Sequence, residues 1–248
     1  MIILKRILAA VTFFTVFPFS GKGEADPREL GKAMGFFPLA GLFIGLILAC
    51  AYALSSLFFS PLFVSVLVIV LWAFLSGLLH LEGFVDAADG FSAGCGREKT
   101  LEIMKDHHCG AKGVILLVLL IVSKIAVFNE TPDSLRIAAL LLAPVAGRWA
   151  MVCAACLCPY ARKTGGFGRV FVENCGKREF FLSSFIFVFT ASFLLRLGVF
   201  IWIMPFLFFV FISLFWLNRR IGGVTGDILG ALNEVSELVC LSFFLFMR

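Results

Sequence analysis

The chain has 248 residues, of which 61% are hydrophobic and only 15% are charged, and its mean hydropathy is +1.04. A soluble domain of this size is very rarely so apolar, so the composition argues against a soluble enzyme and predicts an all-α, polytopic helical membrane protein. The formal net charge of +5 is small, and no nucleic-acid partner is expected from it.

The first 20 residues predict a helix that lies on the membrane surface. They combine an early basic pair, Lys5 and Arg6, with an apolar run that stops at Pro18. A short re-entrant segment is the alternative, and no small-residue cleavage site for a signal peptide is evident. A polar connector follows, in which Asp26 is the expected N-cap of a helix that begins at Pro27.

Apolar runs that could cross a bilayer then follow one another to the end of the chain. We expect six or seven spans in a single domain covering residues 1–248, interrupted by an acidic loop at 80–112. The expected runs are 34–58, 61–79, 113–128, 135–157, 180–198, 200–217 and 227–247.

The basic residues indicate how these spans are oriented. If seven spans are counted, 16 of the 21 Lys and Arg residues fall on the side that holds residues 1–33. Because Lys and Arg concentrate in cytoplasmic loops, this asymmetry places residues 80–112 in the cytoplasm. The sequence therefore predicts a multi-pass membrane protein, the lipid bilayer being its partner, with the acidic stretch facing the cytoplasm.

The longest polar stretch in the chain, residues 80–112, predicts a metal site. It contains all three histidines and six of the 16 acidic residues. Glu82, Asp86 and Asp89 have helical spacing, and Glu102 and Asp106 repeat the four-residue interval on the next segment. Clustered carboxylates repel one another, and a set of oxygen ligands favours a hard cation, Mg²⁺ or also Mn²⁺. We expect two facing helix ends that offer these five acids to a shared metal.

The segment LEIMKDHHCG, residues 101–110, also carries groups that could meet a phosphate. Lys105, His107 and His108 are candidates for phosphate contacts or for proton transfer. A connecting and capping role for the same residues is the alternative.

Near the C-terminus, GGVTGDILGALNEVSE combines a glycine-rich turn with a helix that carries acids. The turn and the helix N-terminus predict a phosphate site, and acids within a membrane helix are functional by default. The candidates are Gly222, Gly223, Thr225, Gly226, Asp227, Asn233 and Glu234. Two alternatives remain: helix capping with a paired buried acid, or an ion path through Asp227, Glu234 and Glu237 in an ion-coupled transporter.

The segments APVAGRW and PYARKTGGFGR contribute further basic candidates for phosphate contacts, namely Arg148 within an apolar span and Arg162 and Lys163 in the loop after it. A loop that only enforces orientation in the membrane is the alternative for the second segment.

Four motifs follow one another along nearly the whole chain: HLEGFVDAADGFSAG, LEIMKDHHCGAKGV, APVAGRWAMV with PYAR, and GGVTGDILGALNE. In this order they resemble the cobalamin synthase (adenosylcobinamide-GDP ribazoletransferase) family. The resemblance implies a membrane enzyme that uses Mg²⁺ to join adenosylcobinamide-GDP and α-ribazole, or its 5′-phosphate, with release of GMP. It further implies metal binding by Glu82, Asp86, Asp89 and Asp106, with Asp89 or Asp106 as general base. The sequence leaves open whether the chain forms a homo-oligomer.

A second resemblance is more local. DAADGFSA, residues 86–93, is similar to the opening of the CDP-alcohol phosphotransferase motif of phospholipid synthesis, but Gly94 stands where that motif has arginine. The nucleotide released, GMP or CMP, would separate these two transferases.

Overall fold

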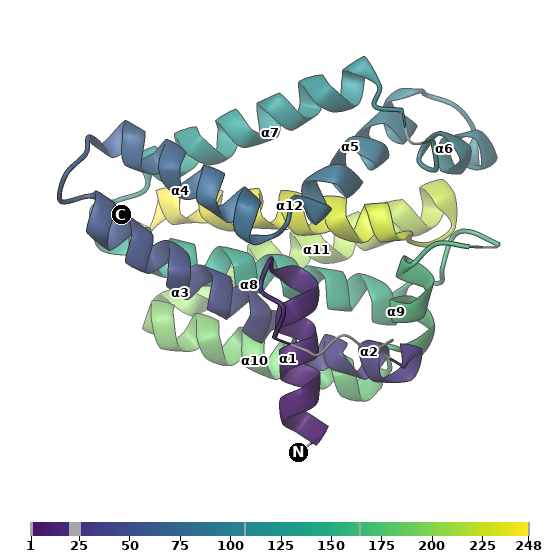
Figure 1. The fold of residues 1–248 in the computed structure, drawn as a ribbon, viewed down its shortest axis with the longest axis horizontal. Coiled ribbons are helices and arrows are strands. Elements are labelled where there is room, and N and C mark those ends of the chain that lie inside the picture. Colours follow the sequence, from purple (N-terminus) through teal and green to yellow (C-terminus); the bar gives the residue numbers. More distant parts are fainter. Residues whose placement is uncertain (1, 20–25, 107, 164, 248) are drawn as a thin grey trace.

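The computed structural model describes residues 2–19, 26–106, 108–163 and 165–247, and most of them are helical (Figure 1). The described residues contain no strand, only a single bridge between Tyr160 and Val224. The α-helices are α1 (Ile2–Phe14), α2 (Pro27–Ala33), α3 (Phe37–Ser55), α4 (Pro61–Leu75), α5 (Leu79–Ser92), α6 (Arg97–Ile103), α7 (Ala111–Glu130), α8 (Asp133–Leu157), α9 (Gly168–Asn174), α10 (Lys177–Leu195), α11 (Val199–Ile221) and α12 (Gly226–Phe243).

The predicted all-α membrane architecture is confirmed. Five stretches of the described chain are long and apolar enough to cross a membrane, and a sixth results if α4 and α5 form one bent span. One of the five, Lys177–Ile221, consists of α10 and α11, which are separated by the 3₁₀ turn Arg196–Gly198. Phe187 of α10 lies against Trp202 and Phe206 of α11, so the two helices lie side by side. Counting them separately gives the expected six or seven spans.

Helices α4 and α5 meet at a bend of 91°. Gly77 and Leu78 both have positive φ angles, 62° and 60°, and this left-handed pair turns the chain sharply. The bend directs α5, with its acidic residues, away from the axis of α4. The stretch expected as an acidic loop therefore begins as a helix, as the spacing of its carboxylates predicted.

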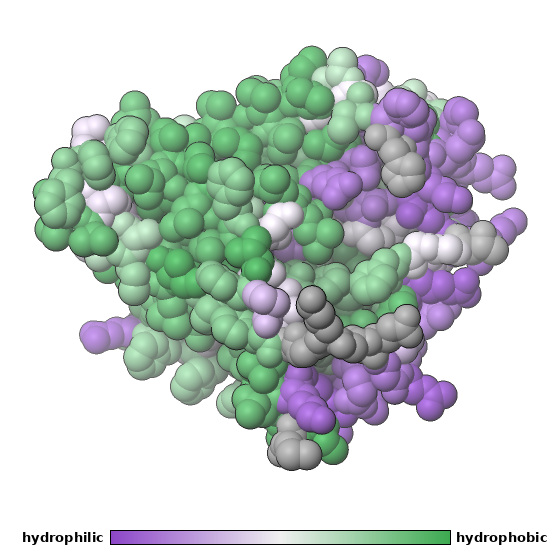
Figure 2. All heavy atoms as spheres, in the orientation of Figure 1, coloured by the Kyte–Doolittle hydropathy of each residue, from purple (hydrophilic) through white to green (hydrophobic). Residues whose placement is uncertain are grey.

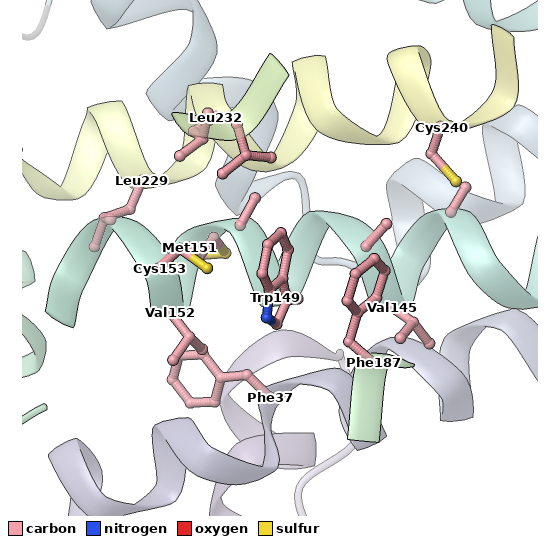
Figure 3. Packing of buried hydrophobic residues seen from close by; sticks show 14 of the residues in the cluster. Phe37, Val145, Trp149, Met151, Val152, Cys153, Phe187, Leu229, Leu232 and Cys240 are labelled. Carbon is pink, nitrogen blue, oxygen red and sulfur yellow. The ribbon is translucent and has the colours of Figure 1, made fainter. Parts of the chain in front are cut away.

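Helix α8 forms the centre of the core. It packs against α3, α10 and α12, and Figure 3 shows it between α12 on one side and residues such as Phe37 and Phe187 on the other. Gly41 and Gly45 allow α3 to approach α8 closely, because a Cβ at Gly41 would lie 2.4 Å from the carbonyl oxygen of Pro144. Small residues four apart favour this kind of contact between membrane helices.

The two ends of the molecule differ in polarity. Figure 2 shows hydrophilic residues gathered at the end where Figure 1 places α6 and α9, while hydrophobic residues cover the opposite end. Near the polar end lies α2, where Asp26 caps the helix by accepting a hydrogen bond from the backbone N–H of Arg28 and Pro27 is the first helical residue, as predicted. Helix α1 packs across α2 and α3, with Phe14 fully buried.

Candidate active site

The predicted site residues converge only in part, in a cavity of about 310 Å³. The cavity is lined by the first turns of α5 and α12, by the residues after α6, by α1, and by the segment between α8 and α9. Its charged lining residues are Glu82, Asp86, Lys105, Asp106, Arg162 and Asp227. Residues from four separate parts of the sequence thus meet at one place.

Glu82 and Asp86 reach the cavity together, as their four-residue spacing predicted. Gly83 lies between them and lets α5 approach α12, because a Cβ at this position would lie 2.9 Å from the carbonyl oxygen of Asp227. A Cβ at Gly230 of α12 would in turn lie 3.2 Å from the carbonyl oxygen of His80. The two glycines bring the acids of α5 and Asp227 of α12 to the same cavity.

Asp227 and Arg162 form the best-defined ion pair of the cavity. Their Oδ2 and Nη2 atoms lie 2.6 Å apart, and Nη2 of Arg162 also donates to the carbonyl oxygen of Met104. Thr225 is the N-cap of α12, since its hydroxyl oxygen accepts a hydrogen bond from the N–H of Ile228. Arg162 therefore lies beside the start of α12, where an anion is also favoured by the helix dipole.

Asp89 faces away from this cavity. Its two carboxylate oxygens accept hydrogen bonds from the N–H groups of Gly110 and Gly113, at 2.7 and 2.8 Å. These backbone N–H groups at the start of α7 have no acceptor within the helix, and Asp89 supplies one. A Cβ at Gly113 would lie 2.5 Å from an oxygen of Asp89, which explains why glycine stands there. The structure thus ties Asp89 to helix α7 rather than to the other acids of α5.

Gly113→Ala is expected to destabilise the protein by about 1–3 kcal/mol, because the added methyl group must push the Asp89 carboxylate or the Val85 carbonyl away. The free energy of unfolding in mixed detergent micelles is the measurement. Ala111→Ser, at an exposed position of the same helical turn, is the control and should change it by less than about 0.5 kcal/mol. Equal stability of the two variants would contradict the close contact.

Some of the predicted residues in α6 and in the segment after it line the cavity, and others are exposed to solvent. Asp106 and Lys105 line the cavity. Asp106 also accepts a hydrogen bond at 2.7 Å from Nδ1 of His108, and this bond raises the pKa of that imidazole above its ordinary value. Glu102 is exposed and pairs with Lys99, so it is not brought to the cavity. His107, a predicted phosphate contact, lies outside the described residues.

Three of the predicted substrate-binding residues lie in a buried polar network within the helix bundle instead. Arg148 of α8 is fully buried and pairs with Glu237 of α12, while Lys124 of α7 binds both Glu237 and Glu234 at 2.6 Å. Asn233 donates to both of these acids. Two of the three acids that an ion path would use, Glu234 and Glu237, are thus bound to Lys124 and Arg148. Arg148, Asn233 and Glu234 do not line the cavity.

The glycine-rich turn between α11 and α12 contacts protein backbone. Val224 donates a hydrogen bond to the carbonyl oxygen of Pro159, and a Cβ at Gly223 would lie 2.0 Å from that oxygen. Gly222 and Gly223 have positive φ angles of 75° and 142° and lie outside the cavity, whereas Gly226 lines it. Lys163 is exposed and also lies outside the cavity. Close approach to the backbone of Pro159 accounts for Gly223, and the left-handed C-cap of α11 accounts for Gly222.

The donor set of the cavity suits a hard divalent cation. Four carboxylates face two cationic side chains there, so that two negative charges remain unbalanced when all six groups are ionised. Oxygen ligands of this kind are those that Mg²⁺ prefers. In the part of the chain that the structure describes, however, no three Asp, Glu, His or Cys side chains are gathered closely enough to hold a metal as they stand.

Several lining residues were not identified from the sequence. They are aromatic or apolar, and their types alone carry no signal: Phe13, Phe14, Tyr160, Phe167 and Phe171. His80 also lines the cavity although it is only 2% exposed. A disulfide between Cys156 and Cys175 joins the last turn of α8 to the end of α9 and encloses the segment that carries three of these aromatic residues.

A second and larger cavity has a different character. It has a volume of about 590 Å³, lies between α5, α7, α11 and α12, and is lined almost entirely by apolar side chains such as Phe84, Phe91 and Trp216. It contains none of the predicted site residues. Its lining offers no groups for phosphate or metal chemistry, so the smaller charged cavity is the candidate active site.

Comparison with known proteins places the chain in a family. The family model described as "Cobalamin-5-phosphate synthase" matches residues 6–245. A protein of Thermoanaerobacter sp. (strain X514), named adenosylcobinamide-GDP ribazoletransferase, is 34% identical to this chain, and the alignment covers 97% of each of the two chains. Proteins of the same name from Desulforamulus reducens and Syntrophobacter fumaroxidans are 38% identical, covering 92% and 94% of this chain and 91% and 95% of their own. No solved structure matches the chain.

Proposed function

The chain belongs to the cobalamin-5-phosphate synthase family, and we propose that it catalyses the reaction for which its relatives are named, the transfer of a ribazole to adenosylcobinamide-GDP. A hydroxyl of α-ribazole, or of its 5′-phosphate, attacks the phosphorus atom that bears the cobinamide. The new P–O bond joins the ribazole to this phosphate, the pyrophosphate bond breaks, and GMP leaves. The product is adenosylcobalamin or its 5′-phosphate.

The observation that carries this proposal is the meeting of acidic and basic side chains in one cavity. Transfer at a pyrophosphate requires cationic groups that hold phosphate oxygens and a base that accepts the proton of the attacking hydroxyl. Arg162 and Lys105 line the cavity and can bind phosphate oxygens, the first at the N-terminus of α12. Asp106 lines the same cavity and can accept the proton.

Between the two candidate bases, the contacts favour Asp106. Asp89 uses both carboxylate oxygens to accept backbone hydrogen bonds from the N–H groups of Gly110 and Gly113 at the start of α7. Asp89 does not line the cavity that holds Glu82, Asp86 and Asp227, but it shares a neighbouring cavity with Asp106, which lines both. The role that remains for Asp89 is to hold the start of α7 against α5.

Glu82, Asp86 and Asp227 would hold the Mg²⁺ ion, with Asp106 within the same cavity. When bound there, the ion would neutralise charge that develops on the phosphate oxygens. The carboxylates of α5 and α12 would hold the ion at a fixed place, because their helices are fixed against each other at Gly83 and Gly230.

We also propose that the protein lies in the bacterial cytoplasmic membrane with the cavity facing the cytoplasm. The apolar helices support a multi-pass arrangement, and the Lys and Arg residues are concentrated in the segments on one side.

Chelation of divalent cations is expected to abolish GMP release by the purified protein in liposomes supplied with adenosylcobinamide-GDP and α-ribazole. With excess EDTA the rate should fall by more than about 10²-fold, because the phosphate charge is no longer neutralised. Added Mg²⁺ or Mn²⁺ should restore it, and Na⁺ at the same ionic strength should not. Full activity in EDTA would remove the metal from the proposal. Absence of GMP release by folded protein, with CMP release from a CDP-alcohol, would favour the other transferase.

A further inference from the structure

The cavity has two chemically different halves. One half carries the charged groups of α5 and α12, and the other is built from aromatic side chains of α1, α9 and the loop before α9. A ligand that fits both halves must combine an anionic part with a flat apolar part. The proposed phosphate chemistry accounts for the charged half only.

The aromatic half is an ordered group of rings. Phe13 and Phe167 are stacked, with ring centres 5.6 Å apart and planes inclined by 16°. Phe171 stands edge-on to both, at 4.9 Å from Phe13 and 5.6 Å from Phe167. Phe171 is only 4% exposed and also contacts the buried Phe37, so the group is anchored in the core.

Phe167 is the exposed member of this group. Its side chain is 58% exposed although it lies in a polar, glycine-rich loop. The loop is fixed on both sides of this residue. A Cβ at Gly168 would lie 2.5 Å from the backbone nitrogen of Gly226, and the Tyr160 hydroxyl donates a hydrogen bond to the carbonyl oxygen of Gly165. An exposed ring is thus held beside the start of α12, next to the charged half.

On the basis of the function proposed above, we propose that Phe167, supported by Phe13 and Phe171, is the stacking platform for the flat aromatic base of a nucleoside or nucleotide substrate. The phosphate or ribose of the same ligand then extends toward Arg162 and Asp227 across the cavity. Two bases in the reaction share this chemistry, the benzimidazole of α-ribazole and the guanine of adenosylcobinamide-GDP. Helix α1 would then contribute to substrate binding, because Phe13 belongs to this helix.

Phe167→Ala is expected to raise the KM for one substrate by about 5- to 100-fold, the range found for loss of stacking on one base. Each KM is measured with the other substrate at saturation. A rise for α-ribazole alone assigns the platform to the benzimidazole, and a rise for adenosylcobinamide-GDP alone assigns it to guanine. Phe167→Tyr should keep KM within about threefold of the wild type, because the aromatic face remains. Unchanged KM values for both substrates in Phe167→Ala would overturn the proposal.

Two comparisons separate stacking from general hydrophobic contact and from damage to the fold. Phe167→Leu keeps apolar volume but has no flat face, and it should behave like the alanine variant; wild-type KM values in it would overturn the platform. Phe181→Ala removes an exposed ring of α10 outside the cavity and should leave both constants unchanged.

Binding measured without turnover separates this proposal from the proposed function. Equilibrium dialysis of α-ribazole and of GMP against wild type and Phe167→Ala tests the platform directly. Binding that weakens in the variant, in a wild type that releases no GMP, would support the platform and contradict the transferase. Turnover by the wild type, together with equal binding of both ligands by the variant, would overturn the platform and leave the transferase intact.

Discussion

Asp86→Asn is expected to lower the rate of GMP release by about 10²- to 10³-fold, the largest effect on catalysis predicted for any single residue of the cavity. Asp86 lines the cavity together with Glu82 and Asp227, and its carboxylate interacts electrostatically with acids of both its own helix and α12. The amide keeps the shape of the side chain but removes one negative charge from the proposed Mg²⁺ ligands.

The assay uses protein in liposomes with both substrates at saturation and with Mg²⁺ varied over a wide range. Besides the lower rate, the variant should need a higher Mg²⁺ concentration for half-maximal activity. Glu98→Gln is the matched control, because Glu98 is an exposed acid of α6 outside the cavity, and its rate should stay within about twofold of the wild type. If Asp86→Asn kept half of the wild-type rate, the cavity would not be the catalytic centre.

Glu237→Gln is expected to destabilise the protein by about 3–5 kcal/mol, the largest effect on folding, because it leaves an uncompensated positive charge inside the bundle. Glu237 is fully buried and binds both Arg148 and Lys124, while Glu234 binds Lys124 and lies 4.0 Å from Nδ1 of His80. Unpaired charge is especially unfavourable among membrane helices. The free energy of unfolding, measured by denaturant titration in mixed micelles, reports the effect.

A second variant separates charge balance from other damage. Arg148→Met combined with Glu237→Gln removes one charge of each sign and leaves the Lys124–Glu234 pair at 2.6 Å. It should recover more than half of the stability lost in Glu237→Gln. The double variant should also keep GMP release within about fivefold of the wild type, because neither residue lines the cavity. A loss of 100-fold in a stable double variant would instead support the phosphate contact that the sequence predicted for Arg148.

Several features were predictable from the sequence because they depend on local pattern. Apolar runs long enough to cross a bilayer determine helices almost without regard to their neighbours, so the number of spans and their approximate limits agree with the structure. The four-residue spacing of Glu82 and Asp86 places them on one face of any helix, and the structure brings both to the cavity. Order and identity of the motifs likewise indicated the family that the comparisons show.

What the sequence could not decide is which groups meet across the bundle. Asp89 has helical spacing relative to Glu82 and Asp86, yet its side chain does not line the cavity. It binds two backbone N–H groups at the start of α7 instead. Arg148 and Glu234 looked like substrate contacts because buried charges suggest function, but they find partners on other helices. These choices depend on which helices pack together and at which glycines, a long-range property that no local spacing contains. The tertiary structure alone therefore decided that Asp227 and the ring of Phe167 join the acids of α5 in one cavity.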